Sequence, residues 1–215
     1  MKFFDRFFVR ASIWGREIAD IFISFPWVTH AIYHFFPEVV QCVKMPFPAS
    51  VQLEFSPHFH EPGAPDQTRI GCRIDQSADQ CSVTVSGPVT GQPPPPGPAG
   101  RFEELWRHDV IEVFLLGAGE RYLELELGPH GHYWLLMLHG CRNIVSEFEP
   151  LGHTWRCGED RWEVCVRIPC AVLPAGLCAF NVTTILGPQR FHGSYVPLPG
   201  DKPDFHQLDC FHFPG

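Results

Sequence analysis

Acidic residues alternate with leucines in one short segment of the sequence. The segment RYLELEL (residues 121–127) carries Glu124 and Glu126 two positions apart, and Glu112 stands in the apolar segment before it. Successive side chains of a strand point to opposite faces, so the two glutamates share a face with Tyr122 and the leucines take the other. Such carboxylates can accept hydrogen bonds from sugar hydroxyls or help to hold Ca²⁺, which prefers oxygen ligands. The simpler interpretation is a solvent-exposed acidic face whose partners are Arg107, Arg121 or Arg142.

Aromatic side chains offer a second kind of contact with a sugar, because the C–H face of a pyranose ring stacks on an indole or phenol ring. Trp106 precedes the acidic segments, at a position from which a side chain can reach the rim of a sheet. Trp134 follows Tyr133 directly, so one of the two faces the core and the other faces away. Trp155 lies in the segment GHTWRCGED, which we expect to be a loop. Core packing is the alternative for each tryptophan, and Trp106 is the first candidate for stacking.

The segment KPDFH near the C-terminus carries two further polar candidates. Asp204 follows Pro203, which is typical of an Asx turn, and Phe205 can close the end of a core. The alternative is that Asp204 and His206 line the same pocket as the acidic and aromatic candidates. The predicted ligand-binding residues are therefore Trp106, Glu112, Tyr122, Glu124, Trp134, Asp204 and His206.

Histidines form two close pairs, His58 with His60 and His130 with His132. In an extended segment both imidazoles of a pair lie on one side and can hold Zn²⁺ or Cu²⁺ when a third ligand approaches. Neither pair is accompanied by a second pair of ligands, so we expect surface or turn roles. A haem site with His and Met ligands is disfavoured, because Met137 lies in an apolar segment typical of a core. We predict no resident cofactor, with Ca²⁺ as the alternative.

Catalytic signatures are missing from the sequence. It contains no G-x-S-x-G, no P-loop, no G-x-G-x-x-G after a strand and no H-E-x-x-H. Paired carboxylates also suit glycosidase chemistry, but any acidic strand produces such pairs. A binding module is therefore favoured over an enzyme. The alternatives are a small hydrolase or metal-dependent enzyme using Glu112, Glu124 and His130, and an interaction protein that binds through its N-terminal segment or the loop Pro93–Pro96.

Short segments of β-branched and aromatic residues between Gly and Pro predict the strands that position these side chains. The clearest is a hairpin of Asp109–Leu116 and Arg121–Leu127, continued by His132–Leu138. Residues 91–100 (GQPPPPGPAG) are expected to form a loop, because proline lacks the amide proton of a sheet ladder. Val172–Ala175 is expected to form one helical turn. The other predicted strands are Val51–Phe55, Arg69–Asp75, Cys81–Ser86, Trp162–Ile168, Cys178–Leu186 and Gln207–Phe213.

Composition supports a single β-rich domain. The chain has 215 residues, 45% of them hydrophobic, and its 22 prolines and 19 glycines argue against a helical bundle. A formal net charge of −8 provides no basic surface for nucleic acid. The nine cysteines are an odd number without C-x-x-C, which suits free thiols in a reducing compartment.

Residues 1–48 differ from the rest of the chain. Aromatic and apolar residues recur every three or four positions from Phe4 to Ile18 and predict an amphipathic helix, a candidate for contact with a membrane surface or a protein partner. No apolar segment approaches the ~20 residues of a transmembrane helix. Charged residues among the aromatics do not fit a secretory signal. We expect a cytoplasmic protein, with mitochondria as the alternative because the segment carries several arginines.

Five short stretches carry a resemblance to a known family. In sequence order they are Leu105-Trp106, Asp109–Phe114, Tyr122–Gly131, Arg142-Asn143 and Lys202–His206. From Phe102 to Phe213 the chain resembles an uncharacterised family of small animal proteins with a DOMON-like sandwich, similar to the family 9 carbohydrate-binding modules. Residues 49–100 match it loosely and residues 1–48 do not. The resemblance implies a two-sheet antiparallel sandwich and, by fold analogy alone, binding of a sugar or a haem; it implies no activity.

These observations together predict an all-β antiparallel sandwich of the jelly-roll type over residues 49–215. An amphipathic extension over residues 1–48 precedes it, and a Pro-rich loop over residues 91–100 interrupts it. The predicted function is that of an intracellular module for a carbohydrate or a similar polyhydroxyl ligand.

Overall fold

The computed structural model describes residues 12–13, 16–17, 47–200 and 202–214. The chain divides into two compact units, residues 1–45 and residues 46–215. In the first unit the described residues form two short strands, β1 (Ser12–Ile13) and β2 (Arg16–Glu17), which pair antiparallel. The predicted amphipathic helix otherwise falls outside the described residues. Within the described part, no helix has the length and apolar character that crossing a membrane requires.

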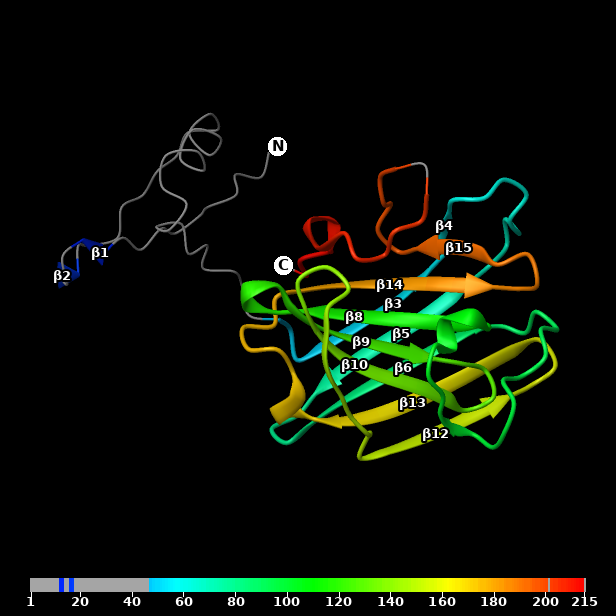
Figure 1. The fold of residues 1–215 in the computed structure, drawn as a ribbon, viewed down its shortest axis with the longest axis horizontal. Helices are drawn as coiled ribbons and strands as arrows, with labels where there is room; N and C mark the ends of the chain where they lie inside the picture. The colour runs from blue at the N-terminus through cyan, green and yellow to red at the C-terminus, as the bar shows by residue number, and fades with distance from the viewer. Residues whose placement is uncertain (1–11, 14–15, 18–46, 201, 215) are drawn as a thin grey trace, which may run out of the picture. The chain divides into compact units, whose positions relative to one another are not determined.

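The second unit is a sandwich of two sheets (Figure 1). The strands of the larger sheet are β4 (His58–Phe59), β7 (Gly100–Arg101), β8 (Val110–Leu116), β9 (Arg121–Leu127), β10 (His132–His139), β11 (Ile144–Glu147), β14 (Ala179–Leu186) and β15 (Phe191–Ser194). Their order is β11-β10-β9-β8-β14-β15-β4, and β7 pairs parallel with β10. The strands of the smaller sheet are β3 (Ser50–Phe55), β5 (Ile70–Gln76), β6 (Gln80–Pro88), β12 (Gly152–Cys157) and β13 (Arg161–Pro169). Their order is β12-β13-β6-β5-β3, with every pairing antiparallel.

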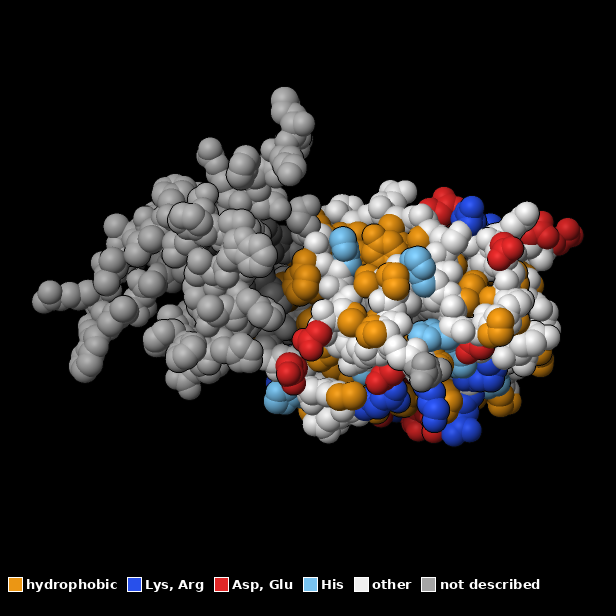
Figure 2. Space-filling view, turned by 90° about the horizontal axis from the view of Figure 1, so that it is seen from above, with side chains coloured by type: hydrophobic (Ala, Val, Ile, Leu, Met, Phe, Trp, Pro, Cys, Tyr) orange, Lys and Arg blue, Asp and Glu red, His pale blue; other side chains and the backbone are white. Residues whose placement is uncertain are grey.

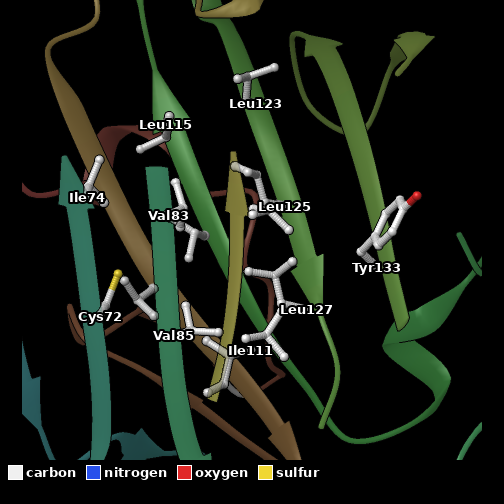
Figure 3. Close-up of a cluster of buried hydrophobic side chains, with 14 of the residues drawn as sticks. Cys72, Ile74, Val83, Val85, Ile111, Leu115, Leu123, Leu125, Leu127 and Tyr133 are labelled. Carbon is white, nitrogen blue, oxygen red and sulfur yellow. The ribbon is translucent and has the colours of Figure 1, made fainter. Parts of the chain in front are cut away.

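The main hydrophobic core lies between the two sheets. Figure 3 shows Leu123, Leu125 and Leu127 of β9 opposite Val83 and Val85 of β6, and all five side chains are inaccessible to solvent. Each leucine buried in this way contributes about 1.5–3 kcal/mol to stability. The predicted alternation along β9 and the predicted all-β antiparallel sandwich are therefore confirmed.

A second hydrophobic cluster covers the outer face of the large sheet. The 3₁₀-helix η1 (Leu105–Arg107) and the described residues of the segment 198–211 pack against outward-facing side chains of β8, β9, β10 and β14. As a result every residue of β8, and every residue of β9 after Arg121, is buried. The members of this outer cluster are Leu105, Val110, Phe114, Leu116, Tyr122, Trp134, Leu136, Leu138, Cys178, Ala179, Ile185, Leu198, Phe205 and Phe211.

Surface charge is mixed on the face seen in Figure 2. Hydrophobic side chains and histidines lie in the middle of the described surface there, and acidic and basic side chains gather toward its edges. No continuous field of one sign covers the described part of this face.

Several sequence-based expectations were wrong in detail. The segment Gln207–Phe213 is not the predicted strand. Its residues Leu208–Cys210 form the 3₁₀-helix η4, and His212 makes an isolated β-bridge with Phe180. The other 3₁₀-helices are η2 (Ala118–Glu120) and η3 (Cys170–Val172), and η3 begins two residues before the turn predicted at Val172–Ala175. Trp155 lies in strand β12 instead of a loop. Strands β4, β7 and β15 were missed because they have only two to four residues.

Candidate functional site

A pocket of about 410 Å³ opens on the outer face of the large sheet. Its lining comes from strands β8, β9, β10, β11, β14 and β15 and from four segments between or after them. These segments contribute residues 104 and 106, residue 142, residue 190, and residues 203, 205 and 206. Part of the segment that covers the outer face therefore also forms one side of the pocket.

The strand register brings three carboxylates together in this pocket. Glu112 of β8 stands directly opposite Glu126 of β9, and Glu124 follows on the same face. Directly opposite residues on neighbouring strands have Cβ atoms about 4.5–5.5 Å apart. One carboxylate oxygen from each of the three residues lies within 4.8 Å of the other two. The proximity of Glu112 that the sequence suggested is therefore a consequence of the β8–β9 pairing.

All three carboxylates are buried, which corrects the interpretation of an exposed acidic face. Their exposed fractions are 3% for Glu112, 5% for Glu124 and 1% for Glu126. None of the ion pairs found in the described part of the chain reaches them. Arg107 pairs with Glu104 and Arg142 pairs with Asp204. The prediction of arginine partners for these carboxylates was wrong, because protein segments cover the outer face that the sequence suggested was exposed to solvent.

Two of the three glutamates accept one hydrogen bond each from the protein. The hydroxyl of Thr183 on β14 donates to Glu112 Oε2 at 2.6 Å. The backbone N–H of Trp106 donates to Glu126 Oε2 at 2.8 Å. Glu124 accepts no hydrogen bond from any described residue, although its side chain lines the pocket.

Burial and mutual repulsion change the protonation of this cluster. Burial raises the pKa of Glu112 to about 7, against the opposing effect of the Thr183 hydrogen bond. Burial, with repulsion from Glu112, raises the pKa of Glu124 and of Glu126 well above the ordinary value. Without a ligand the cluster therefore retains protons to a higher pH than ordinary glutamates do, and a protonated carboxyl can both donate and accept hydrogen bonds.

Trp106 is held in position at the edge of the pocket. Its N–H is bonded to Glu126, and its carbonyl accepts a hydrogen bond from Arg190 at 3.0 Å. The guanidinium carbons of Arg107 and Arg190 lie 4.9 and 5.8 Å from the centre of the indole ring. The side chain nevertheless remains 37% exposed. An anchored but accessible indole is suited to stacking on a ligand ring.

Trp134 forms part of the same wall and is 9% exposed. It stands opposite Glu126 in the β9–β10 pairing, and its indole N–H donates to Glu147 Oε2 at 3.1 Å. Its neighbour Tyr133 faces the core between the sheets. The prediction that the two residues face in opposite directions is confirmed.

The C-terminal candidates form a network at the other side of the pocket. His206 lines the pocket, and its Nδ1 lies 2.7 Å from the hydroxyl of Tyr122. Burial lowers the pKa of His206 to about 4, so its ring is neutral. Asp204 accepts hydrogen bonds from Arg142 at 2.8 Å and from the backbone N–H of His206 at 3.1 Å. The second bond is the Asx turn expected from the sequence.

The structure thus brings most of the predicted site residues together. Trp106, Glu112, Glu124, Trp134 and His206 line the pocket. Tyr122 and Asp204 instead bond to groups that line it. Sequence reasoning did not include Glu126, Arg142 and Arg190 among the predicted site residues. The alternation that selected Glu124 also selects Glu126, whereas Arg190 follows β14 in a turn with no local signal.

The histidine pairs do not gather further ligands. Among the described residues, the three glutamates are the only group of three or more metal-ligating side chains that lie close together. His130 belongs to the turn between β9 and β10, and the histidines that line the pocket are His192 and His206. The alternative of an enzyme that uses His130 therefore lacks this histidine in the pocket lining. Met137 packs into the core between the sheets.

Comparisons with known proteins place the chain among uncharacterised relatives. No family model matches it. The human UPF0462 protein C4orf33 is 34% identical over 163 residues, which cover 71% of this chain and 78% of the human protein. A candidate carbohydrate-binding protein from Bacteroides uniformis aligns with a TM-score of 0.53 and 17% identity, over 75% of this chain and 83% of that one. A family 9 carbohydrate-binding module from Caldicellulosiruptor kristjanssonii, in complex with cellotriose, aligns with a TM-score of 0.41 and 11% identity, over 65% and 73%.

Proposed function

The chain belongs to the UPF0462 family of animal proteins, and we propose that its sandwich binds a carbohydrate or a similar polyhydroxyl ligand in the pocket on the large sheet. One observation carries the proposal: an accessible indole, Trp106, stands beside buried hydrogen-bonding carboxyls in a single pocket. The proposed role is binding without chemistry.

The composition of the pocket supports this class of ligand. Its volume of about 410 Å³ falls within the ~300–1,000 Å³ typical of small-molecule sites. The indole of Trp106 offers a flat apolar surface for the C–H face of a sugar ring. Glu112, Glu124 and Glu126 offer acceptors, and donors when protonated, to hydroxyl groups at the ring edge.

The fold shared with the Bacteroides protein adds support by analogy. That protein is itself only a candidate carbohydrate-binding protein. The side chains of this pocket, not the fold, must therefore decide the function.

A binding screen of the full chain tests the proposal. We expect one class of mono- or oligosaccharide to raise the melting temperature and to give a saturable signal in calorimetry. A ligand at a hundred times its Kd adds about 2.7 kcal/mol to the free energy of unfolding. Trp106→Ala should abolish binding, because it removes the stacking surface but leaves the backbone bond to Glu126.

Trp155→Ala is the matched control. Trp155 is 47% exposed, but it lies on β12 of the other sheet. Its loss should leave saccharide binding unchanged. Absence of saccharide binding to the unmodified chain would overturn the proposal. Release of shortened saccharide would show that the protein hydrolyses its ligand instead of only binding it.

A further inference from the structure

No ion pair in the described part of the chain reaches the three buried carboxylates of the pocket, although the charges of Arg142 and Arg190 act to lower the pKa of Glu112. Arg142 lines the pocket, but its ion pair is with Asp204. Arg190 donates to the carbonyl of Trp106. Buried acidic groups are stable only when they are neutralised or paired. Neither arginine forms an ion pair with the cluster, so a ligand can supply a positive charge in direct contact with it.

Glu124 points to a ligand independently of the other two carboxylates. Its side chain is 5% exposed and lines the pocket, yet no described residue donates a hydrogen bond to it. Glu112 and Glu126 each have a protein donor. The Glu124 carboxyl therefore faces the pocket without a protein donor, and a donor that enters the pocket can bond to it.

The spacing of the oxygens fits an ammonium group. Three oxygens no more than 4.8 Å apart leave a point about 2.8 Å from each, the length of a charge-assisted N–H···O bond. A primary ammonium has three N–H donors and can bond to all three carboxylates at once.

The rest of the wall favours an organic cation over a metal ion. Ca²⁺ takes six to eight oxygen ligands, whereas the side chains beside the cluster include Trp106, Trp134, Leu136 and Ile185. The faces of indole rings attract organic ammonium ions through cation–π interactions. The pocket is also far larger than one ion requires.

We infer that the ligand is an amino sugar or a closely similar amine with hydroxyl groups, whose ammonium nitrogen sits between Glu112, Glu124 and Glu126. The sugar ring then lies against Trp106. This inference rests on the proposed function and narrows its ligand class.

Proton release is a direct consequence of this binding mode. Burial and repulsion raise the pKa values of the three carboxyls, so the empty pocket holds protons near neutral pH. An entering ammonium stabilises the ionised carboxylates and displaces those protons. A neutral sugar has no charge with which to do so. The other ionisable groups that line the pocket are Glu104, Arg142, Arg190, His192 and His206.

The experiment compares glucosamine with glucose and N-acetylglucosamine, which have the same ring without the charge. Calorimetry of the full chain is run in two buffers of different ionisation enthalpy. We expect glucosamine to bind at least tenfold more tightly than either neutral sugar and to release protons. Glu124→Gln should remove this preference, because it removes one of the three carboxylates that face the ammonium nitrogen. Because Glu124 has no protein hydrogen bond, this variant keeps the fold, which its melting temperature checks.

Glu163→Gln is the charge-matched control, since Glu163 pairs with Arg156 on the other sheet. It should keep the tenfold preference. Equal binding of glucosamine and the neutral sugars would overturn the inference and leave the proposed function intact. Binding of no saccharide would overturn both. Binding of Ca²⁺ alone, without any saccharide, would also overturn both and make the cluster a metal site.

Discussion

Strands β9 and β13 show how similar sequence patterns can lead to opposite environments. Both begin with arginine and alternate, as RYLELEL at residues 121–127 and RWEVCVR at residues 161–167. The apolar positions of both strands face the core between the sheets. On the outer face, Glu124 and Glu126 of β9 are buried, and no ion pair of the described residues includes them. Glu163 of β13 is 38% exposed and pairs with Arg156 at 3.1 Å.

The difference lies in what covers each outer face, not in the strands themselves. The helix η1 and the segment 198–211 pack over β9, whereas Glu163 on the outer face of β13 remains open to solvent. On the covered face, the glutamates have raised pKa values and line a pocket. On the uncovered face, the glutamate forms a surface ion pair. Function on this sandwich therefore depends on segments far from the acidic strand in sequence.

Removal of the cover should have the largest effect on stability. Phe205 packs in the outer cluster and lines the pocket, with 8% of its side chain exposed. Phe205→Ala should lower the free energy of unfolding by about 3–5 kcal/mol, because it leaves a cavity and exposes apolar neighbours. Denaturant titration measures the change.

The control for Phe205 is Leu151→Ala. Leu151 is 57% exposed, so its truncation removes few buried contacts, and the free energy of unfolding should change by no more than about 0.5 kcal/mol. Equal effects of the two variants would contradict the view that the outer segment is a structural cover.

The pH dependence of stability should distinguish the covered glutamates from the exposed one. The folded pKa of Glu112 is raised from 4.5 to about 7, so its protonated form is favoured by folding. This contribution is fully present below pH 4.5 and is lost as the pH rises through 7. The loss amounts to about 3 kcal/mol.

Glu112→Gln tests this dependence, because its amide oxygen can still accept the Thr183 hydrogen bond. The unfolding free energy of the variant, measured in the absence of ligand, should fall less than that of the unmodified chain between pH 4.5 and pH 8. Glu163→Gln should follow the unmodified chain. Parallel curves for all three proteins would mean that folding does not shift the pKa of Glu112.

The core of the sandwich was predictable from sequence because strand alternation is a local signal. The leucines of β9 were assigned to one face of the strand by counting residues alone, and that face lies in the core. The same reasoning placed Trp134 and Tyr133 on opposite faces. Each of these assignments needs only the period of a strand.

The protonation of the site was not predictable in the same way, because burial of its acids is set by distant segments. Nothing in RYLELEL shows that residues 198–211 will cover it. Arg190 enters the site from a turn after β14, and the segment 207–213 has the composition of a strand but forms η4. A loop that folds over a sheet leaves no periodic pattern in its own sequence.

The exposed ion pair on β13 should give the smallest effect. Arg156 and Glu163 face each other across the β12–β13 pairing, and the arginine side chain is 79% exposed. Arg156→Ala should therefore lower the free energy of unfolding by less than about 1 kcal/mol. The change should become smaller in 1 M salt, where exposed charges are screened within about 3 Å. Denaturant titration at low and high salt measures it, and a larger, salt-independent loss would show that the small sheet also depends on buried charge.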